Sequence, residues 1–309
     1  MRSRDPRRDP GDSLLAPMSP SRSLARGAVA MMLSSLAFTL MGVCIQICAQ
    51  SLPNGMVVFF RNFAGLCFLS PIVMKGGLGI MRTEHIKEHI LRGTAGLASM
   101  YCFFFALGHL RLADATLLNY TLPLFIPVVE SLWLGEPMSP RLALPLGLGF
   151  LGVVVVLRPG SGLMTAAAGL GLIAGFLSAV AQTGVRRLTQ TEPTVRIVIY
   201  FALMGTTISA IGLPFVWVTP KPAVWIVIVA MGLAATTGQL LMTKAYSHAP
   251  ASQIGGFVYT GVIFAALMDW LRLGTVPEPL FFVGAVLVMA AGALMFRMAS
   301  RTPVVMDSE

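Results

Sequence analysis

Long apolar runs dominate the sequence, and they constrain the fold more than any other feature. Residues 115–129, for example, carry no charged side chain. A hydrocarbon core of about 30 Å requires about 20 helical residues. Because backbone groups in lipid must be paired internally and no strand-like alternation is present, each run predicts a transmembrane helix. Ten spans are predicted, at roughly 26–48, 56–74, 91–109, 113–133, 141–157, 165–186, 197–217, 223–246, 251–272 and 279–297.

The composition excludes a water-soluble globule. Only 11% of the 309 residues are charged and the mean hydropathy is +0.79, whereas soluble domains carry about 25% charged residues. The net charge of +9 is spread over the ends of the apolar runs, which is typical of membrane orientation and not of a nucleic-acid surface. We therefore expect an all-α integral membrane protein without nucleic-acid partners.

The basic residues predict the orientation of the chain. With a cytoplasmic N-terminus, seventeen Lys and Arg residues, including Arg92 beside the second loop, lie on the inner side and four on the outer side. This bias follows the positive-inside rule, and ten spans return the C-terminus to the cytoplasm. Residues 1–25 are expected to form a disordered cytoplasmic tail, and residues 299–309 a second cytoplasmic tail.

An internal repeat divides the chain. A shift of 139 aligns Tyr120 with Tyr259, Thr121 with Thr260 and Glu130 with Asp269, and neighbouring shifts align further positions. Residues 26–158 and 165–298 thus form two copies of one five-helix unit. Because five is odd, the second copy is predicted to be inverted, as in carriers whose substrate site lies at the interface of the repeats. A duplicated membrane scaffold without transport is the alternative.

Several stretches resemble the EamA-type transporters of the drug/metabolite transporter superfamily. They are ATLLNYTLPLFIPVVESLWLGE, GQLLMTKAYSHAPAS, FVYTGVIFAALMDWLRLG and VVFFRNFAGLCFLSPIV. The resemblance covers about residues 27–298 and implies a ten-helix bundle that moves a small metabolite across a bacterial inner membrane. It also implies a broad substrate range, because this family carries amino acids, amino-acid-derived metallophores, S-adenosylmethionine, vitamins and drugs.

Catalytic and cofactor motifs fail on their context. Gly147-Leu-Gly149-Phe-Leu-Gly152 matches G-x-G-x-x-G but lies inside a predicted transmembrane helix, where small residues favour close helix packing. His85 and His89 are four residues apart in a charged loop without a third ligand, so they are interpreted as solvated surface residues. We expect no enzyme activity, no cofactor and no metal.

Polar residues inside the spans are candidates for the substrate site. Aromatic rings and amides can hold an amphiphile in a cavity between the two copies. For any one of these residues, the alternative is a hydrogen bond between helices. The predicted substrate-binding residues are Tyr101, Asn119, Tyr120, Gln182, Gln239 and Tyr259.

Four charged residues inside the spans are predicted to form two gates. Asp269 is paired with Arg61 on the outer side, and Glu130 with Lys244 on the inner side. A pair that forms only when its side is closed would shift the conformational equilibrium, and protonation of either acid would offer a route for proton coupling. The alternative is that each acid is a fixed cap at a helix end.

The sequence therefore predicts a secondary active transporter. Its expected substrate is a small amphiphilic, zwitterionic and amino-acid-derived metabolite, with export favoured. Uptake of S-adenosylmethionine or a vitamin-like metabolite is the alternative within transport, and a non-transporting scaffold or receptor is the alternative from another class. The expected partners are the metabolite, membrane lipid and a proton as candidate coupling ion, for a monomer or homodimer.

Overall fold

A computed structural model describes residues 20–134, 141, 143–157, 165–248, 255–274 and 277–299. Every regular element in these ranges is a helix. Six helices are long and apolar enough to cross a membrane: α1 (Pro20–Ala49), α2 (Asn54–Gly76), α3 (Ile86–His109), α7 (Ala166–Leu188), α8 (Thr194–Val216) and α9 (Pro222–His248). The other elements are α4 (Leu112–Asn119), α5 (Leu122–Leu134), α6 (Ala143–Leu157), α11 (Thr260–Leu273) and α12 (Pro279–Ala299), with 3-10 helices η2 (Leu78–Met81) and η4 (Gly255–Tyr259).

Helix α1 begins earlier than the sequence indicated. It starts at Pro20, inside the segment 1–25 that was predicted to be a disordered tail. Proline is tolerated in the first turn, where its missing N–H has no partner in the helix. Residues 1–19 and 300–309 lie outside the described residues.

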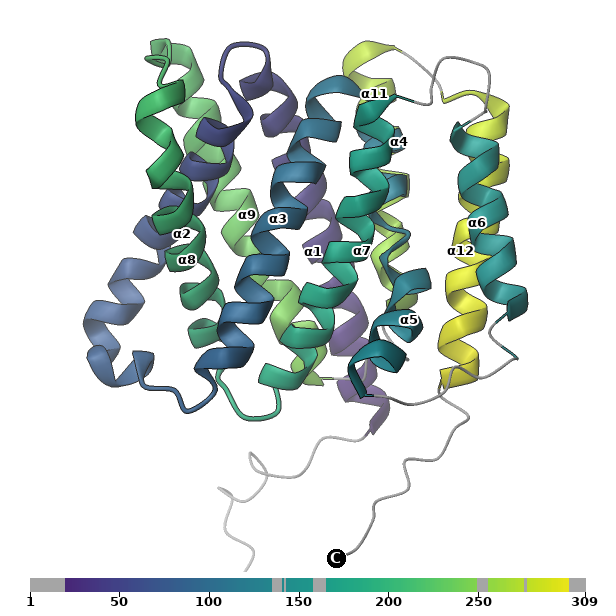
Figure 1. The fold of residues 1–309 in the computed structure, drawn as a ribbon, viewed down its shortest axis with the longest axis horizontal. Coiled ribbons are helices and arrows are strands. Elements are labelled where there is room, and N and C mark those ends of the chain that lie inside the picture. The colour runs from purple at the N-terminus through teal and green to yellow at the C-terminus, as the bar shows by residue number, and fades with distance from the viewer. Residues whose placement is uncertain are drawn as a thin grey trace, which may run out of the picture.

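The long helices form one bundle (Figure 1). Helices α1, α9, α3 and α7 lie in its middle, with α1 packed against α9 and α3 against α7. Helices α2 and α8 pack together on one side, and α6 and α12 form a pair at the opposite edge. The first residues of α1 and the last residues of α12 lie at the same end of the bundle.

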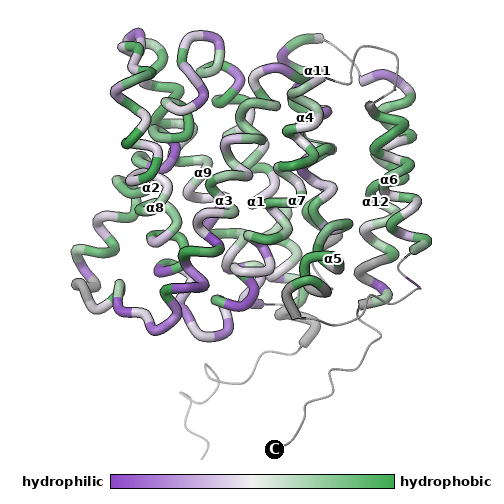
Figure 2. The backbone as a smooth tube through the Cα atoms, in the orientation of Figure 1, coloured by the Kyte–Doolittle hydropathy of each residue, from purple (hydrophilic) through white to green (hydrophobic). Residues whose placement is uncertain are grey.

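The surface of the bundle suits a bilayer. Hydrophobic residues cover most of the length of the helices, and hydrophilic residues gather toward the two ends (Figure 2). Large apolar side chains such as Ile211, Phe215 and Ile226 are exposed. Exposed apolar area on this scale is costly in water and favourable in lipid.

The predicted span 113–133 is interrupted near its middle. Helix α4 ends at Asn119, and α5 begins two residues after Tyr120. Pro123 in the first turn of α5 has no N–H, and its ring would clash with the carbonyl of Asn119 in a continuous helix. The carbonyl of Leu118 accepts from the Thr121 hydroxyl at 2.7 Å and from the Thr121 backbone N–H at 3.3 Å. The proline and these local bonds together fix the break.

The second copy has an interruption at the aligned position. The 3-10 helix η4 ends at Tyr259 and α11 begins at Thr260. The Thr260 hydroxyl donates to the carbonyl of Phe257 at 2.7 Å, the same three-residue bond that Thr121 makes in the first copy. The two aligned Tyr-Thr pairs therefore lie where the helix changes, at the gap between α4 and α5 and at the junction of η4 with α11.

One contact between the copies occurs twice with exchanged roles. The Ser34 hydroxyl of α1 donates to the carbonyl of Gly238 in α9 at 2.8 Å. The Ser99 hydroxyl of α3 donates to the carbonyl of Ala174 in α7 at 2.9 Å. Ser34 aligns with Ala174, and Ser99 with Gly238, at the repeat shifts of 140 and 139. The pair α1–α9 thus matches the pair α7–α3.

Glycines bring α6 and α12 into close contact. A Cβ atom at Gly152 would lie 2.8 Å from the carbonyl oxygen of Gly284, and one at Gly284 would lie 2.7 Å from that of Gly152. A Cβ atom at Gly149 would lie 2.5 Å from a methyl carbon of Leu124, whereas one at Gly147 would meet nothing within 4 Å. Gly149 and Gly152 therefore serve helix packing, and Gly147 does not.

Candidate substrate pocket

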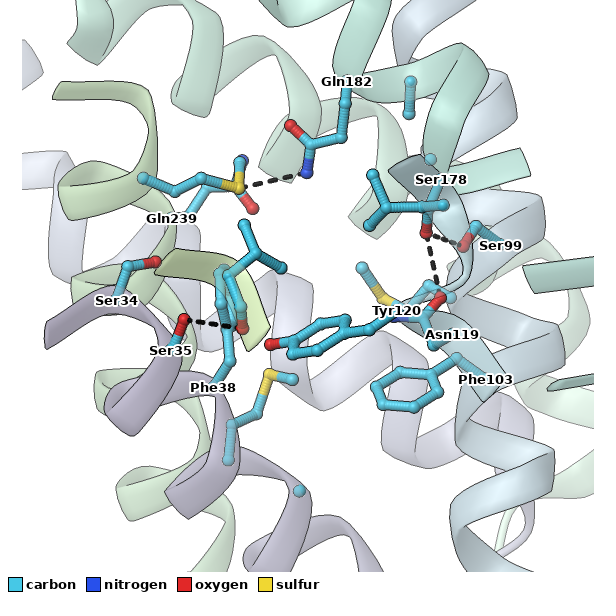
Figure 3. Close-up of a pocket in the computed structure, with 18 of the residues that line it drawn as sticks. Ser34, Ser35, Phe38, Ser99, Phe103, Asn119, Tyr120, Ser178, Gln182 and Gln239 are labelled. Atoms are coloured by element: carbon cyan, nitrogen blue, oxygen red, sulfur yellow. Dashed lines mark hydrogen bonds between the residues drawn. The ribbon is translucent and has the colours of Figure 1, made fainter. Parts of the chain in front are cut away.

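A cavity of about 1070 Å³, including its opening to solvent, lies among the central helices. Its walls come from α1, α2, α3, α4 and the first residue of α5 in the first copy and from α7, α8, α9 and η4 of the second. Figure 3 shows Tyr120 reaching across this space toward Ser35 and Phe38, with Phe103 beside its ring. The cavity therefore lies between the two copies and combines aromatic surfaces with scattered polar groups.

Four of the six predicted substrate-binding residues line the cavity: Asn119, Tyr120, Gln182 and Gln239. Tyr101 and Tyr259 are not among the lining residues. Tyr101 is half-buried, and the buried Tyr259 ring packs against Gly292 of α12. The structure thus brings four of these side chains together and separates two from them.

A chain of hydroxyl and amide groups occupies one wall of the cavity (Figure 3). The Ser178 hydroxyl donates to Asn119 Oδ1 at 3.1 Å, and the hydroxyls of Ser99 and Ser178 lie 2.8 Å apart. These groups come from α3, α4 and α7. A Cβ atom at Gly175 would lie 3.0 Å from the Leu118 carbonyl oxygen, so this glycine lets α7 approach the broken span and bring Ser178 within reach of Asn119.

The two glutamines of the cavity have unused hydrogen-bonding capacity. Gln182 Nε2 donates to the sulfur of Met242 at 3.1 Å, whereas its Oε1 has no partner. Gln239 Nε2 is also buried without a partner. Buried amides normally find hydrogen-bond partners. A bound molecule with a donor and an acceptor would supply the missing hydrogen bonds of both glutamines.

Two buried arginines supply the only charges among the described residues that line the cavity. Arg61 of α2 is 5% exposed and Arg92 of α3 is 4% exposed. Their guanidinium carbons lie 5.3 Å and 3.7 Å from the centroid of the Phe201 ring in α8. Arg61 also donates to Asn62 Oδ1 at 3.0 Å. This end of the cavity is therefore strongly cationic.

The sequence analysis counted Arg92 only as one of the inner-side cations and did not expect it to line the cavity. Helix α3 begins at Ile86, so Arg92 lies more than one turn inside the helix and faces inward. A Cβ atom at Gly184 of α7 would lie 3.0 Å from Arg92 Cβ, and this glycine leaves the space that the arginine enters. The pocket serines were also missed; their only signal was a position in the middle of a predicted span. These are Ser34, Ser35, Ser99 and Ser178.

The predicted pair of Arg61 and Asp269 is absent from this conformation. Asp269 is 1% exposed, and its Oδ2 accepts a hydrogen bond from the backbone N–H of Ala113 at 2.9 Å. Ala113 lies in the first turn of α4, where a carboxylate is favoured by the free N–H groups and the helix dipole. Asp269 therefore caps a helix here, while Arg61 faces the cavity.

The second predicted pair is only partly described. Lys244 is exposed on α9 and lines a shallow depression with Thr194 of α8 and His248. Glu130 lies on α5, which packs against α7, but its side chain lies outside the described residues. The pair of Glu130 and Lys244 stays a prediction.

Further bonds join the segments around Asp269. Gln46 of α1 donates from Nε2 to the carbonyl of Leu110 at 3.1 Å and accepts at Oε1 from Arg272 of α11 at 2.9 Å. Arg111 and Asp114 form an ion pair at 2.8 Å beside them. Helices α1, α4 and α11 are thus held together at the end of the bundle where α1 ends.

The opposite end of the bundle holds a second polar network. The Glu192 carboxylate, between α7 and α8, accepts hydrogen bonds from the Thr83 hydroxyl and from Arg196. Arg196 Nε also donates to the carbonyl of Ile80 at 2.6 Å. Burial raises the pKa of Glu192, but the bonds from Thr83 and Arg196 outweigh it and leave the pKa below its ordinary value. The segment between α2 and α3 is fastened to α8 in this way.

His89 belongs to the same network, so the interpretation of this residue as solvated surface is wrong. It is 1% exposed, and its ring stacks on that of Tyr200 at 4.3 Å between centroids. Its Nε2 atom lies 4.0 Å from Glu192 Oε1. Among the described residues, no group of three or more His, Cys, Asp or Glu side chains could hold a metal ion.

Comparison with known proteins identifies the family. The profile of the EamA-like transporter family matches residues 25–158 and 165–297. The chain belongs to this family. The resemblance inferred from the sequence is confirmed, and the cavity is that of an EamA-like transporter, a multi-pass membrane protein of a transporter family and not of an enzyme family.

Three curated relatives show the range of this family. The pseudopaline exporter CntI of Pseudomonas aeruginosa is 29% identical and covers 87% of this chain and 95% of its own. A riboflavin transporter of Brucella anthropi is 25% identical, with 81% and 90% covered. An S-adenosylmethionine uptake transporter of Rickettsia bellii is 22% identical, with 76% and 81% covered. One solved structure matches with a TM-score of 0.61 at 19% identity, covering 92% of this chain and 99% of its own, and supports the fold.

Proposed function

We propose that this EamA-like transporter is a secondary active carrier that exports a small, amphiphilic, zwitterionic and amino-acid-derived metabolite. The observation that carries the proposal is the cavity, which both copies line with aromatic and polar side chains. Small-molecule sites combine an apolar wall with a few placed polar groups in this way. The similarity to an exporter of a small metabolite supports the direction.

The proposal includes ten spans in two inverted five-helix repeats, 26–158 and 165–298. The two broken spans then each cross the membrane once, as α4 with α5 and as η4 with α11. The exchanged bonds of Ser34 with Gly238 and of Ser99 with Ala174 support a two-fold relation. An axis in the membrane plane follows for an odd number of spans per copy, and alternating access is the mechanism that such repeats favour.

The proposed location is a bacterial inner membrane with both termini in the cytoplasm. The start of α1 and the end of α12 lie at the same end of the bundle (Figure 1), which supports an even number of crossings. The excess of Lys and Arg on that side supports a cytoplasmic position. Labelling of single cysteines added before residue 20 and after residue 299 tests this orientation.

Uptake is the second candidate. Relatives named as riboflavin and S-adenosylmethionine transporters share 22–25% identity with this chain. An inward carrier would use the same cavity, because alternating access works in both directions when the gradient is reversed. The sign of the measured flux distinguishes export from uptake.

Flux through vesicles that contain only this protein tests the proposal. Vesicles are loaded with a bacterial metabolite extract, and the released compounds are identified by mass spectrometry. Ser178→Phe places a ring in the cavity and should abolish release, whereas Ile173→Phe on the exposed face of the same helix should not. A scaffold or receptor would give no more release than loaded vesicles that contain no protein. Release that is equal in Ser178→Phe and wild type would assign the flux to another route.

A further inference from the structure

Among the residues that the structure describes, the two arginines of the cavity have no acidic partner. No Asp or Glu is found among the described residues that line the cavity. Arg61 Nε and the Nε and Nη1 atoms of Arg92 are buried without a hydrogen-bond partner. Buried charges are ordinarily paired, because an isolated ion loses its hydration without compensation. This cavity therefore holds two uncompensated positive charges.

The buried acids of the described residues, Asp269 and Glu192, already have other partners. Asp269 accepts from the N-terminus of α4, and Glu192 accepts from Thr83 and Arg196. The Phe201 ring attracts both guanidinium groups through its face. A ring quadrupole is a weaker partner than a full negative charge, and Arg61 Nε and the Nε and Nη1 atoms of Arg92 still have no hydrogen-bond acceptor.

From this we propose that Arg61 and Arg92 bind two carboxylates of the transported molecule. This assignment rests on the proposed transport function and deepens it. Guanidinium groups match carboxylates in shape and bind them through two parallel hydrogen bonds. Two carboxylates would neutralise the two charges, and a cationic molecule would be repelled from this end of the cavity.

The rest of the cavity fits the remainder of such a molecule. Tyr120 and Phe103 present aromatic surfaces, as Figure 3 shows. The unpartnered Oε1 of Gln182 can accept from an N–H group, and the unpartnered Nε2 of Gln239 can donate. The expected substrate class is thus a dicarboxylate with an apolar or aromatic part and a nitrogen that donates hydrogen bonds.

A graded set of probes tests the assignment on the purified full chain in detergent. Phenylsuccinate carries two carboxylates, 3-phenylpropionate one and 3-phenylpropanamide none, while the phenyl group is common to all. A ligand that binds the folded state raises the midpoint of thermal unfolding with its concentration. We expect phenylsuccinate to bind tightest, 3-phenylpropionate more weakly and the amide weakest. An amide that binds as tightly as phenylsuccinate would overturn the proposal.

Variants identify the groups that bind. Arg61→Gln and Arg92→Gln should each weaken phenylsuccinate binding by at least about tenfold, because a buried charge pair loses one partner. Binding of the amide should not change. Lys87→Gln removes an exposed cation of the same helix as Arg92 and should leave every affinity at the wild-type value. Wild-type affinity for phenylsuccinate in both arginine variants would refute the binding of carboxylates by Arg61 and Arg92. If a variant does not fold, the order of the three probe affinities on the wild-type chain decides alone.

This experiment separates the inference from the proposed function. The probes report binding and require no flux. If the probes bind in the expected order through the two arginines but the protein releases nothing from vesicles, the transport function is refuted and the carboxylate-binding site at Arg61 and Arg92 stands. Release of a compound without carboxylates, unchanged in Arg61→Gln and Arg92→Gln, would keep transport and refute the anion site.

Discussion

Asp269 of α11 places a buried carboxylate against the first turn of α4, and replacing this residue removes that charge. Its Oδ2 accepts from the Ala113 N–H at 2.9 Å, and the side chain is 1% exposed. Asp269→Ala leaves that N–H without a partner, which costs about 1–3 kcal/mol for a buried donor. Asp269→Asn keeps an acceptor and loses only the attraction between charge and helix dipole, about 0.3–1 kcal/mol. We therefore expect the alanine variant to be clearly less stable than the asparagine variant.

The same bond holds α11 to α4, so its loss should also loosen this end of the bundle. Cys48 near the end of α1 is 0% exposed and can report the opening once Cys44, Cys67 and Cys102 are replaced by serine. A cost of about 1–3 kcal/mol in the closed state corresponds to about 5–150-fold more opening. Thiol labelling of Cys48 in detergent should accelerate by this factor in Asp269→Ala.

Two control experiments test the capping role of Asp269. Asp114→Asn breaks the partly exposed ion pair with Arg111, and such pairs contribute about 0–1 kcal/mol, so labelling should change little. A double-mutant cycle of Asp269→Ala with Arg61→Gln should show additive effects, because the two side chains have different partners. Wild-type labelling in Asp269→Ala, or strong coupling to Arg61, would refute the capping role and return the acid to the ion-pair gate.

Three more predictions follow from local geometry. Glu192 has a lowered pKa, so the stability it contributes is present above its ordinary pKa and is lost as pH falls through the lowered value; thermal unfolding midpoints should fall with acid in the wild type more than in Glu192→Gln. Gly152→Val should separate α6 from α12, since even a Cβ atom would lie 2.8 Å from a backbone carbonyl oxygen, and should lower the unfolding midpoint and increase proteolysis of α12. Gly232→Ala should destabilise more than Gly93→Ala in the same unfolding assay, because its Cβ would come 2.2 Å from an alanine Cβ in α2, whereas the atom nearest to Gly93 belongs to a flexible methionine.

The fold was largely predictable because hydropathy over about 20 residues is a strong and redundant signal. Asn119 and Tyr120 were found for a related reason: a polar pair in an apolar run has few positions to occupy except an interior cavity. The position of Arg92 in the cavity could not be predicted in either way. A cation near a helix end either extends to the headgroups or turns inward. For Arg92 the outcome depends on the space that Gly184 leaves on α7, a helix far away in the sequence.

The partner of Asp269 was missed for a different reason. A search for pairs in a sequence compares side chains, and the natural match for an acid is a base such as Arg61. The observed partner is a backbone N–H of Ala113, which every residue except proline possesses. Only the three-dimensional course of α4 exposes that donor, so the sequence could state the cap as an alternative and could not choose it.

The break between α4 and α5 changes how force travels along this span. A continuous helix is a stiff lever, so tilting one end must move the other. At Tyr120 and Thr121 the helix is interrupted; α4 packs against α7 and α11, and α5 packs against α7. The two pieces are therefore separate rigid segments joined at Tyr120 and Thr121, so a tilt of one need not be transmitted to the other. In the second copy the junction of η4 with α11 falls at the aligned Tyr259 and Thr260, so each copy has one position along this segment where bending does not require the whole length to move as one rod.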